Sequence, residues 1–428
     1  MIINSLVDKQ IDKIRILLYA DGVEEGFKTG HLKFFNTIIK SLKKKNMIEE
    51  IWVGSVGGKI TNEYEEENSE YNVFGFKDAV DLLEKLSPDL ILLTNTQEHI
   101  QRSTLIAAKF KKIPSVVIKA ETEGIFSNEN NVVFKRISML FLKPSPSWPI
   151  LGILILKKYY FIFKTLKKIG KKLFPILSYL IKDMIKLSKS FSIELQNDDA
   201  DLYLVSNQDW LNYSKKLGIN QNKIKIIGSV TFDEEFDKIL KLNKVINLQF
   251  EILFLTSPLA EHGIWSFSQR DNAVIKIISS IKNNIGDHNL KIKIHPTSET
   301  LEHYKKIINP ISSEIKLYQK GDVTKLINEA DIVIALGDST ALYTVALLKK
   351  PLILMNLFNN DWFFGKQKFV NNCKSIEEMA KHLKNKDYFK NEKDYNIFID
   401  KFIPKFDGKC GEKAANYIFE LLKNKDRL

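Results

Sequence analysis

The sequence predicts an α/β protein built from two parallel, doubly wound domains. Short apolar runs alternate with amphipathic stretches along most of the 428 residues, which is the pattern of repeated strand–helix units. A chain of this length exceeds one compact core, so two domains are expected. A charged linker is expected near residues 235–249, between two such series. We therefore predict an N-terminal domain over 1–235, a C-terminal domain over 250–395, and a C-terminal helical stretch, 396–428, that packs back on the first domain.

Each element is predicted from its periodicity. Strands are expected where apolar residues run together, and helices where they recur every three to four positions. The first series has predicted strands at 14–19, 51–55, 89–94, 115–119, 201–206 and 223–230, with helices at 32–42, 77–86, 101–110 and 210–217. The second has predicted strands at 251–256, 290–294, 315–318, 332–336 and 352–355, with helices at 271–284, 301–308, 341–349, 376–385 and 413–422.

Composition excludes several classes of protein. Only Cys373 and Cys410 are present, in no metal-ligand spacing, which argues against a disulfide framework or a zinc site and fits a reducing compartment. The N-terminus is charged before any apolar run develops, so no signal peptide is visible and a cytoplasmic location is expected. The net charge of +12 arises from 64 Lys and Arg against 52 Asp and Glu. Where the surplus Lys residues lie along the chain indicates which kind of anionic partner they bind.

Most of that surplus lies in one basic insertion, residues 131–195. Its segment 157–190 holds ten Lys and one Asp, and its apolar residues form a helical stripe opposite the lysines, interrupted at Pro175. Such a composition is typical of helices lying in the plane of an anionic membrane; the alternative is a pair of surface helices with a solvated basic face. We predict a peripheral protein on the inner face of the cell membrane, with no nucleic-acid partner and with membrane contacts from Lys164, Lys168, Lys171, Lys182 and Lys186.

Three predicted strands of the second series end in polar residues. If these strands are neighbours in a parallel sheet, their carboxyl ends open onto one crevice, where ligands collect. A histidine after a strand, together with hydroxyls and N–H groups at a helix start, suits a phosphate. The alternative is that Ser339 and Thr340 only cap the following helix. The predicted nucleotide and phosphate ligands are Ser257, His295, Pro296, Asp338, Ser339 and Thr340.

The first series offers candidates for an acceptor site. Asp21, Gly26 and Gly30 lie in the loop after its first strand, and Glu121 and Glu123 follow its fourth strand. A carboxylate at a strand end that faces a bound nucleotide can act as general base on an acceptor hydroxyl. The alternative is that these are solvated loop acids. No acidic Asp-x-Asp metal site is present, so no metal is predicted.

These motifs resemble the GT-B superfamily. The resemblance rests on His295-Pro296 after a second-domain strand and on the segment DIVIALGDSTALYTVALLKKPLIL, and it is strongest over 202–358. It covers most of the chain except the basic insertion, and Asp407-Gly408-Lys409 with Glu412 is similar to a closing motif of capsule transferases. It implies two Rossmann-like domains facing a cleft. The nearest groups are non-hydrolysing UDP-N-acetylglucosamine 2-epimerases and the capsule, teichoic-acid and sialyltransferase-like enzymes.

Departures from the epimerase pattern favour a transferase. Thr340-Ala341 and Thr344-Val345 stand where epimerases carry Gly-Gly and a pair of Glu, and Thr94-Asn95-Thr96 replaces a Gly-Asp-Thr acid site. The resemblance implies metal-independent and cofactor-independent transfer of a sugar, or a polyol phosphate, from a nucleotide-activated donor to a glycan or lipid-linked acceptor. Glu123 or Glu121 would be the base. A sugar-nucleotide epimerase and a non-catalytic scaffold for carbohydrate assembly are the alternatives.

Overall fold

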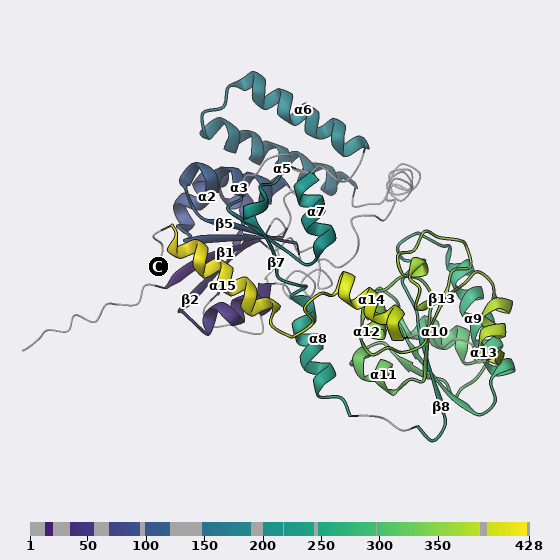
Figure 1. Ribbon diagram of the computed structural model, residues 1–428. Coiled ribbons are helices and arrows are strands. Elements are labelled where there is room, and N and C mark those ends of the chain that lie inside the picture. The colour runs from purple at the N-terminus through teal and green to yellow at the C-terminus, as the bar shows by residue number, and fades with distance from the viewer. Residues whose placement is uncertain are drawn as a thin grey trace, which may run out of the picture. The chain divides into compact units, whose positions relative to one another are not determined.

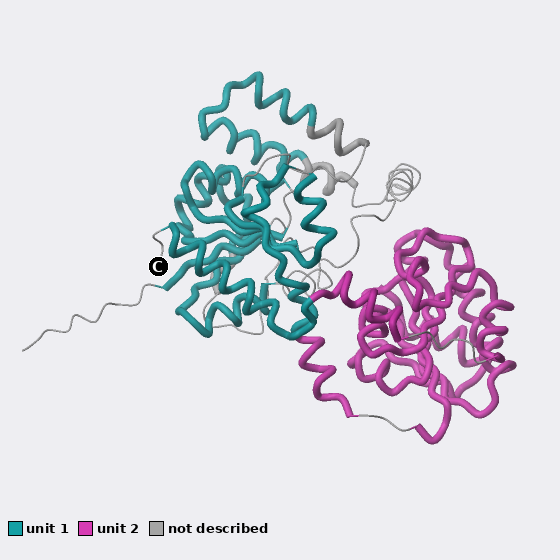
Figure 2. Tube along the Cα trace, viewed as in Figure 1, with its two compact units in different colours: residues 1–233, 405–428 teal, residues 234–404 magenta. Residues whose placement is uncertain are grey.

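The computed structural model divides into two compact units, each described by itself (Figures 1 and 2). Unit 1 comprises Met1–Asp233 with Lys405–Leu428, and unit 2 comprises Glu234–Pro404. The structure describes residues 13–19, 35–54, 68–94, 99–119, 148–189, 200–216, 218–243, 247–296, 298–385 and 392–425.

Unit 1 contains a seven-stranded, fully parallel sheet in the order β3-β2-β1-β4-β5-β6-β7. Its strands are β1 (Ile14–Tyr19), β2 (Ile48–Gly54), β3 (Asn68–Asn72), β4 (Leu90–Leu93), β5 (Ser115–Lys119), β6 (Leu202–Val205) and β7 (Ile224–Ile226). The order reverses between β1 and β4, which is the topological switch point of this sheet. The predicted α/β class is therefore confirmed for this half.

Helices cover both faces of this sheet (Figure 1). Alternate residues of β1 enter different cores: Ile16 and Leu18 pack in one, Leu17 and Tyr19 in the other, as the two-residue period of a strand requires. The helix over 35–43 and α15 (Cys410–Lys423) cover the first face. The remaining unit 1 helices are α2 (Ala79–Leu86), α3 (His99–Lys111), α5 (Trp148–Lys168), α6 (Leu173–Lys189) and α7 (Gln208–Lys216), with short 3-10 turns at Val73–Gly75 and Gln221–Lys223.

The C-terminal helix α15 is fixed to unit 1 by a buried carboxylate. Asp233 accepts hydrogen bonds from the backbone N–H groups of Cys410 at 3.0 Å and Gly411 at 2.7 Å. A Cβ at Gly411 would lie 2.8 Å from the carbonyl oxygen of Thr37, so only glycine permits this close packing. Burial raises the pKa of Asp233, against which the two N–H groups act.

Two predicted boundaries differ in the structure. Residue 396 falls inside α14 (Glu392–Phe402), whose Tyr395, Phe398 and Phe402 pack on aromatic side chains within unit 2. The first part of the predicted linker is helical, because α8 (Thr231–Leu240) runs through it and contains the division between the units.

The basic segment forms a helical hairpin, α5 and α6. Its break lies at Gly170, which has φ +84°, and not at Pro175 as predicted. Pro175 falls in the first turn of α6, where a missing N–H costs nothing. Helix α5 packs on the rest of unit 1 through Phe161, and the Oγ1 atom of Thr165 accepts a hydrogen bond from Ala79 N–H at 3.0 Å. No helix among the described residues is long and apolar enough to cross a membrane.

Unit 2 contains a six-stranded parallel sheet in the order β10-β9-β8-β11-β12-β13. Its strands are β8 (Phe250–Leu255), β9 (His288–Lys293), β10 (Lys316–Tyr318), β11 (Ile332–Ala335), β12 (Leu352–Met355) and β13 (Val370–Cys373). Its helices, besides most of α8 and α14, are α9 (Phe267–Asn284), α10 (Leu301–Ile308), α11 (Val323–Glu329), α12 (Ala341–Leu347) and α13 (Ile376–Asn385), with a 3-10 turn at Phe364–Lys366. The order reverses between β8 and β11, so the switch point lies there.

Candidate functional site

The three polar strand ends of unit 2 lie at one edge of its sheet. Strand β8 is bordered by β9 on one side and by β11 on the other. The Oγ atom of Ser257, after β8, donates to the carbonyl oxygen of Asp338, after β11, at 3.3 Å. The N–H of Thr256 donates to the carbonyl oxygen of Lys293, at the end of β9, at 3.1 Å. The structure thus brings together the loops that carry Ser257, His295 and Asp338.

His295 is held in one orientation by its own loop. Its Nδ1 atom accepts a hydrogen bond from the backbone N–H of Ser298 at 3.1 Å. In the neutral ring the proton then lies on Nε2, which is a donor. Burial lowers the pKa of His295 below its ordinary value, and this favours the neutral form at pH 7. The side chain is half-buried, and Pro296 beside it is exposed.

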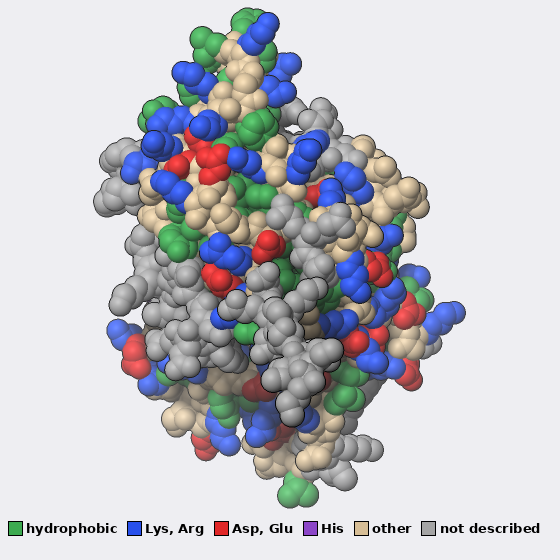
Figure 3. Space-filling view, turned by 90° about the vertical axis from the view of Figure 1, so that its left-hand side faces the viewer, with side chains coloured by type: hydrophobic (Ala, Val, Ile, Leu, Met, Phe, Trp, Pro, Cys, Tyr) green, Lys and Arg blue, Asp and Glu red, His purple; other side chains and the backbone are tan. Residues whose placement is uncertain are grey.

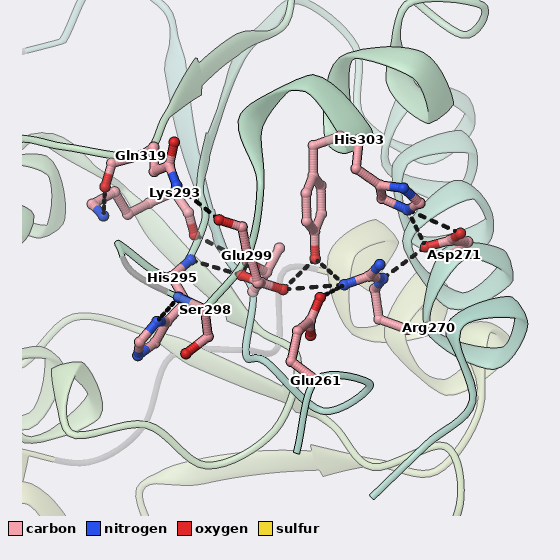
Figure 4. A network of polar contacts seen from close by, with 11 residues as sticks. Glu261, Arg270, Asp271, Lys293, His295, Ser298, Glu299, His303 and Gln319 are labelled. Atoms are coloured by element: carbon pink, nitrogen blue, oxygen red, sulfur yellow. Dashed lines mark hydrogen bonds and ion pairs between the residues drawn. The ribbon is translucent and has the colours of Figure 1, made fainter. Parts of the chain in front are cut away.

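The buried carboxylate of Glu299 organises this loop (Figure 4). Its Oε2 atom accepts hydrogen bonds from the backbone N–H of His295 at 2.7 Å and from the hydroxyl of Thr256. Its Oε1 atom accepts one from the hydroxyl of Tyr304. Glu299 is only 1% exposed. One carboxylate therefore joins the end of β8, the loop after β9 and helix α10.

A buried arginine extends this network to α9. The guanidinium of Arg270 contacts Glu261 at 3.0 Å, Asp271 at 2.7 Å and Glu299 at 3.5 Å. The side chain of Arg270 is 1% exposed. A charge buried this deeply requires partners, and these carboxylates supply them. His303 contacts Asp271 at 3.0 Å on the far side (Figure 4). Sequence reasoning missed this network; the one available signal was an acid four residues after His295, just before the start of α10.

The loop after β11 is fixed by Asp338. Its carboxylate accepts hydrogen bonds from the backbone N–H groups of Phe363 at 2.5 Å and Phe364 at 3.2 Å, at the start of a 3-10 turn. Both carboxylate oxygens of Asp338 thus anchor this loop, and its predicted role as a phosphate ligand stays a prediction.

The two hydroxyls after Asp338 differ. The Oγ atom of Ser339 accepts a hydrogen bond from Ala341 N–H at 3.3 Å, as the helix-cap alternative expects. Thr340 is exposed and makes no capping hydrogen bond. Helix α12 has seven residues, so the strand ends and their side chains, more than a helix dipole, define this site.

An apolar wall lies beside the same loops. Gly337 has φ +91°, and a Cβ there would lie 3.2 Å from both Leu259 and Trp362. Trp265 packs against Phe358 with ring centroids 4.7 Å apart and against Trp362 at 6.2 Å. Gly337 is therefore needed for its backbone conformation and for this close packing. Sequence reasoning did not single out these aromatic side chains.

Thr344, one of the positions that distinguishes this chain from epimerases, is buried in α12. Its hydroxyl donates to the carboxylate of Glu235 at 3.0 Å, and the hydroxyl of Thr324 donates to the same oxygen. The three residues join α8, α11 and α12. Thr344 thus has a packing role inside unit 2.

The remaining predicted site residues fall outside the described residues. Glu121 and Glu123 follow β5 by two and four residues, and the predicted acceptor loop begins directly after β1. The acceptor-side residues outside the description are Asp21, Gly26 and Gly30. Among the residues that the structure describes, no group of three or more His, Cys, Asp or Glu is placed to hold a metal ion. Metal independence stays a prediction.

Comparison with known proteins identifies the fold. The chain matches UDP-GlcNAc 2-epimerase from Neisseria meningitidis bound to UDP-GlcNAc, with a TM-score of 0.54 and 13% identity over 95% of this chain and 100% of that one. The chain has a GT-B fold. The calicheamicin glycosyltransferase CalG4 matches with a TM-score of 0.54 and 10% identity over 96% and 99% of the two chains.

The wall teichoic acid polymerase TagF also matches this chain, with a TM-score of 0.50 and 10% identity over 97% of this chain and 90% of that one. No protein-family model and no curated protein sequence matches the chain. The predicted GT-B fold is confirmed, and at these identities the likeness establishes the fold alone.

Proposed function

We propose that the protein is a GT-B glycosyltransferase of surface polysaccharide or glycolipid synthesis. It transfers a sugar, or a polyol phosphate, from a nucleotide-activated donor to a glycan or lipid-linked acceptor. The observation that carries the proposal is the fixed orientation of His295 in the loop after β9, at the carboxyl edge of the unit 2 sheet. A neutral imidazole with its proton on Nε2 is a ready donor to an anionic oxygen, and it needs no reorganisation when charge develops there.

In this proposal, unit 2 binds the nucleotide of the donor. His295 donates to a phosphate oxygen, and the hydroxyls of Ser339 and Thr340 supply further donors from the loop after β11. Ser257 joins them if its hydroxyl turns from the carbonyl oxygen of Asp338 toward the phosphate. These groups would stabilise the charge that develops on the leaving phosphate. Asp338 and Glu299 shape the loops. The apolar wall of Trp265 and Trp362 excludes water from one side.

The acceptor is activated from unit 1. Glu123, or else Glu121, accepts the proton of the acceptor hydroxyl as it attacks. With a sugar donor the hydroxyl attacks the sugar carbon and the nucleotide leaves with its phosphates. With a polyol phosphate donor it attacks the phosphorus of the transferred phosphate, and the nucleotide leaves with the phosphate that remains. The solved structures that match include nucleotide-sugar epimerases as well as glycosyltransferases. A sugar-nucleotide epimerase is therefore the second candidate, and Thr344-Val345 in place of two acids counts against it.

Product analysis with and without acceptor separates these functions. The protein is incubated with nucleotide sugars, alone and with a detergent-solubilised lipid-linked glycan, and the free nucleotide and sugar isomers are measured. A transferase releases nucleotide in proportion to the glycan that is extended. Isomerisation of the donor without nucleotide release would establish the epimerase, and the absence of any turnover across donors and acceptors would favour the scaffold.

A further inference from the structure

Helix α6 has an exposed apolar stripe. Leu173, Phe174, Leu177 and Ile181 recur at helical spacing and are 60%, 82%, 44% and 55% exposed. The opposite side of α6 is occupied, because Ile176 is 2% exposed and packs against α5. One face of α6 is therefore buried against α5, and an apolar face is exposed. In Figure 1, α6 lies on the outer side of α5, away from the sheet of unit 1.

Lysines border this stripe. Lys171 and Lys172 precede it, Lys182 follows Ile181, and all three are exposed. On the hairpin at the top of Figure 3, lysine and hydrophobic side chains share the surface. An anionic lipid surface takes both kinds of side chain, because its phosphate groups attract the lysines and its acyl chains receive the apolar side chains.

We infer that α6 docks on an anionic membrane surface, with Phe174, Leu177 and Ile181 entering the boundary between headgroups and acyl chains. Its occupant is a lipid bilayer, because the lysines Lys171, Lys172 and Lys182 complement lipid phosphates. Helix α5 connects α6 to the rest of unit 1 through its buried face. It also contributes two exposed apolar side chains, Leu156 and Tyr160, which are 70% and 59% exposed. This docking is independent of the proposed reaction.

This assignment changes which predicted lysines contact the membrane. Lys164 is only partly exposed, with its Nζ 4.5 Å from the ring centroid of Tyr160 on α5. Lys168 lies at the end of α5, next to the turn, and Lys171 and Lys182 flank the apolar stripe of α6. The side chain of Lys186 lies outside the described part of α6. Lys172, which was not predicted, joins the contact set.

Flotation of the full-length protein with vesicles tests this inference. Phosphatidylcholine vesicles with and without phosphatidylglycerol serve as probes. Wild type is expected to float with the anionic vesicles, and less in high salt. A variant with Lys171→Glu, Lys172→Glu and Lys182→Glu is expected to partition roughly 100-fold less, because each Lys near an anionic surface contributes about 1 kcal/mol. A second variant, Phe174→Ser, Leu177→Ser and Ile181→Ser, is expected to lose at least roughly tenfold.

Matched control variants carry the same kinds of substitution at exposed positions outside the α5–α6 hairpin. Lys44→Glu, Lys215→Glu and Lys216→Glu give the same change in net charge at exposed positions of unit 1. Leu240→Ser, Leu248→Ser and Ile397→Ser remove exposed apolar side chains outside the hairpin. Both controls should float like wild type. The inference is overturned if wild type does not bind anionic vesicles, if the controls lose as much, if the serine variant binds as wild type, or if wild type is a dimer in solution that the serine variant dissociates.

Discussion

Replacing Glu299 with alanine is expected to lower the free energy of unfolding of unit 2 by about 3–5 kcal/mol, which is the cost of removing one partner from a buried ionic network. The change leaves the N–H of His295 and the hydroxyl of Tyr304 without this acceptor. The hydroxyl of Thr256 keeps only a long contact, 3.5 Å, with the carbonyl oxygen of Lys293. Each unsatisfied buried donor costs about 1–3 kcal/mol. Arg270 keeps Glu261 and Asp271, which prevents a still larger loss.

Hydrogen exchange of peptides from β8 and β9 measures this effect in unit 2 separately from unit 1. Glu302→Ala is the matched control, because Glu302 lies on the exposed side of α10 and pairs only with Lys305 in the described contacts. That variant should exchange like wild type. If the amides of β8 and β9 are equally protected from exchange in the Glu299→Ala and Glu302→Ala variants, Glu299 does not organise the loop that carries His295.

Replacing His295 with alanine is expected to lower the rate of group transfer by about 100- to 1,000-fold, the usual cost of removing one preorganised donor to a developing negative charge. The loss should fall on kcat more than on KM, since the donor acts most strongly on the leaving phosphate. Steady-state kinetics with the donor and acceptor identified by product analysis measure both parameters.

His288→Ala provides the control for that substitution. His288 starts β9, at the end of the strand opposite His295, and its Nδ1 atom lies 2.7 Å from the carbonyl oxygen of Gly286. Both variants should keep the wild-type circular dichroism and melting behaviour. If His295→Ala and wild type have equal kcat and KM, His295 takes no part in binding the donor or in the transfer step.

The fold could be predicted because strands buried on both faces are apolar throughout. Every residue of β4, β6, β11 and β12 is apolar, and such runs stand out in a sequence. The exceptions lie where that rule does not apply. Strand β3, NSEYN, is a polar strand at the edge of the described sheet, next to β2, so no apolar run marks it.

The site was predictable to the level of its strand ends. Parallel topology brings those ends together, and His295 and Ser257 could be placed at one edge on that basis. Side-chain contacts between elements distant in the sequence could not be predicted from it. Glu299 joins Thr256 and Tyr304 from separate elements, and Asp338 binds the backbone of Phe363. The sequence gives the residue type and not its contacts. An Asp or Glu that binds a ligand therefore cannot be told from one that anchors a loop until the structure shows its partners.

The binding of a nucleotide to unit 2 is the central claim, and thermal unfolding with UDP, CMP, CDP and GDP tests it most directly. A ligand that binds only the folded state at 100 times its Kd adds about 2.7 kcal/mol to stability. We predict that at least one of these nucleotides raises the melting temperature of the wild type, and that the same concentration raises that of His295→Ala less. No shift with any of the four, or an equal shift in both proteins, would contradict the account.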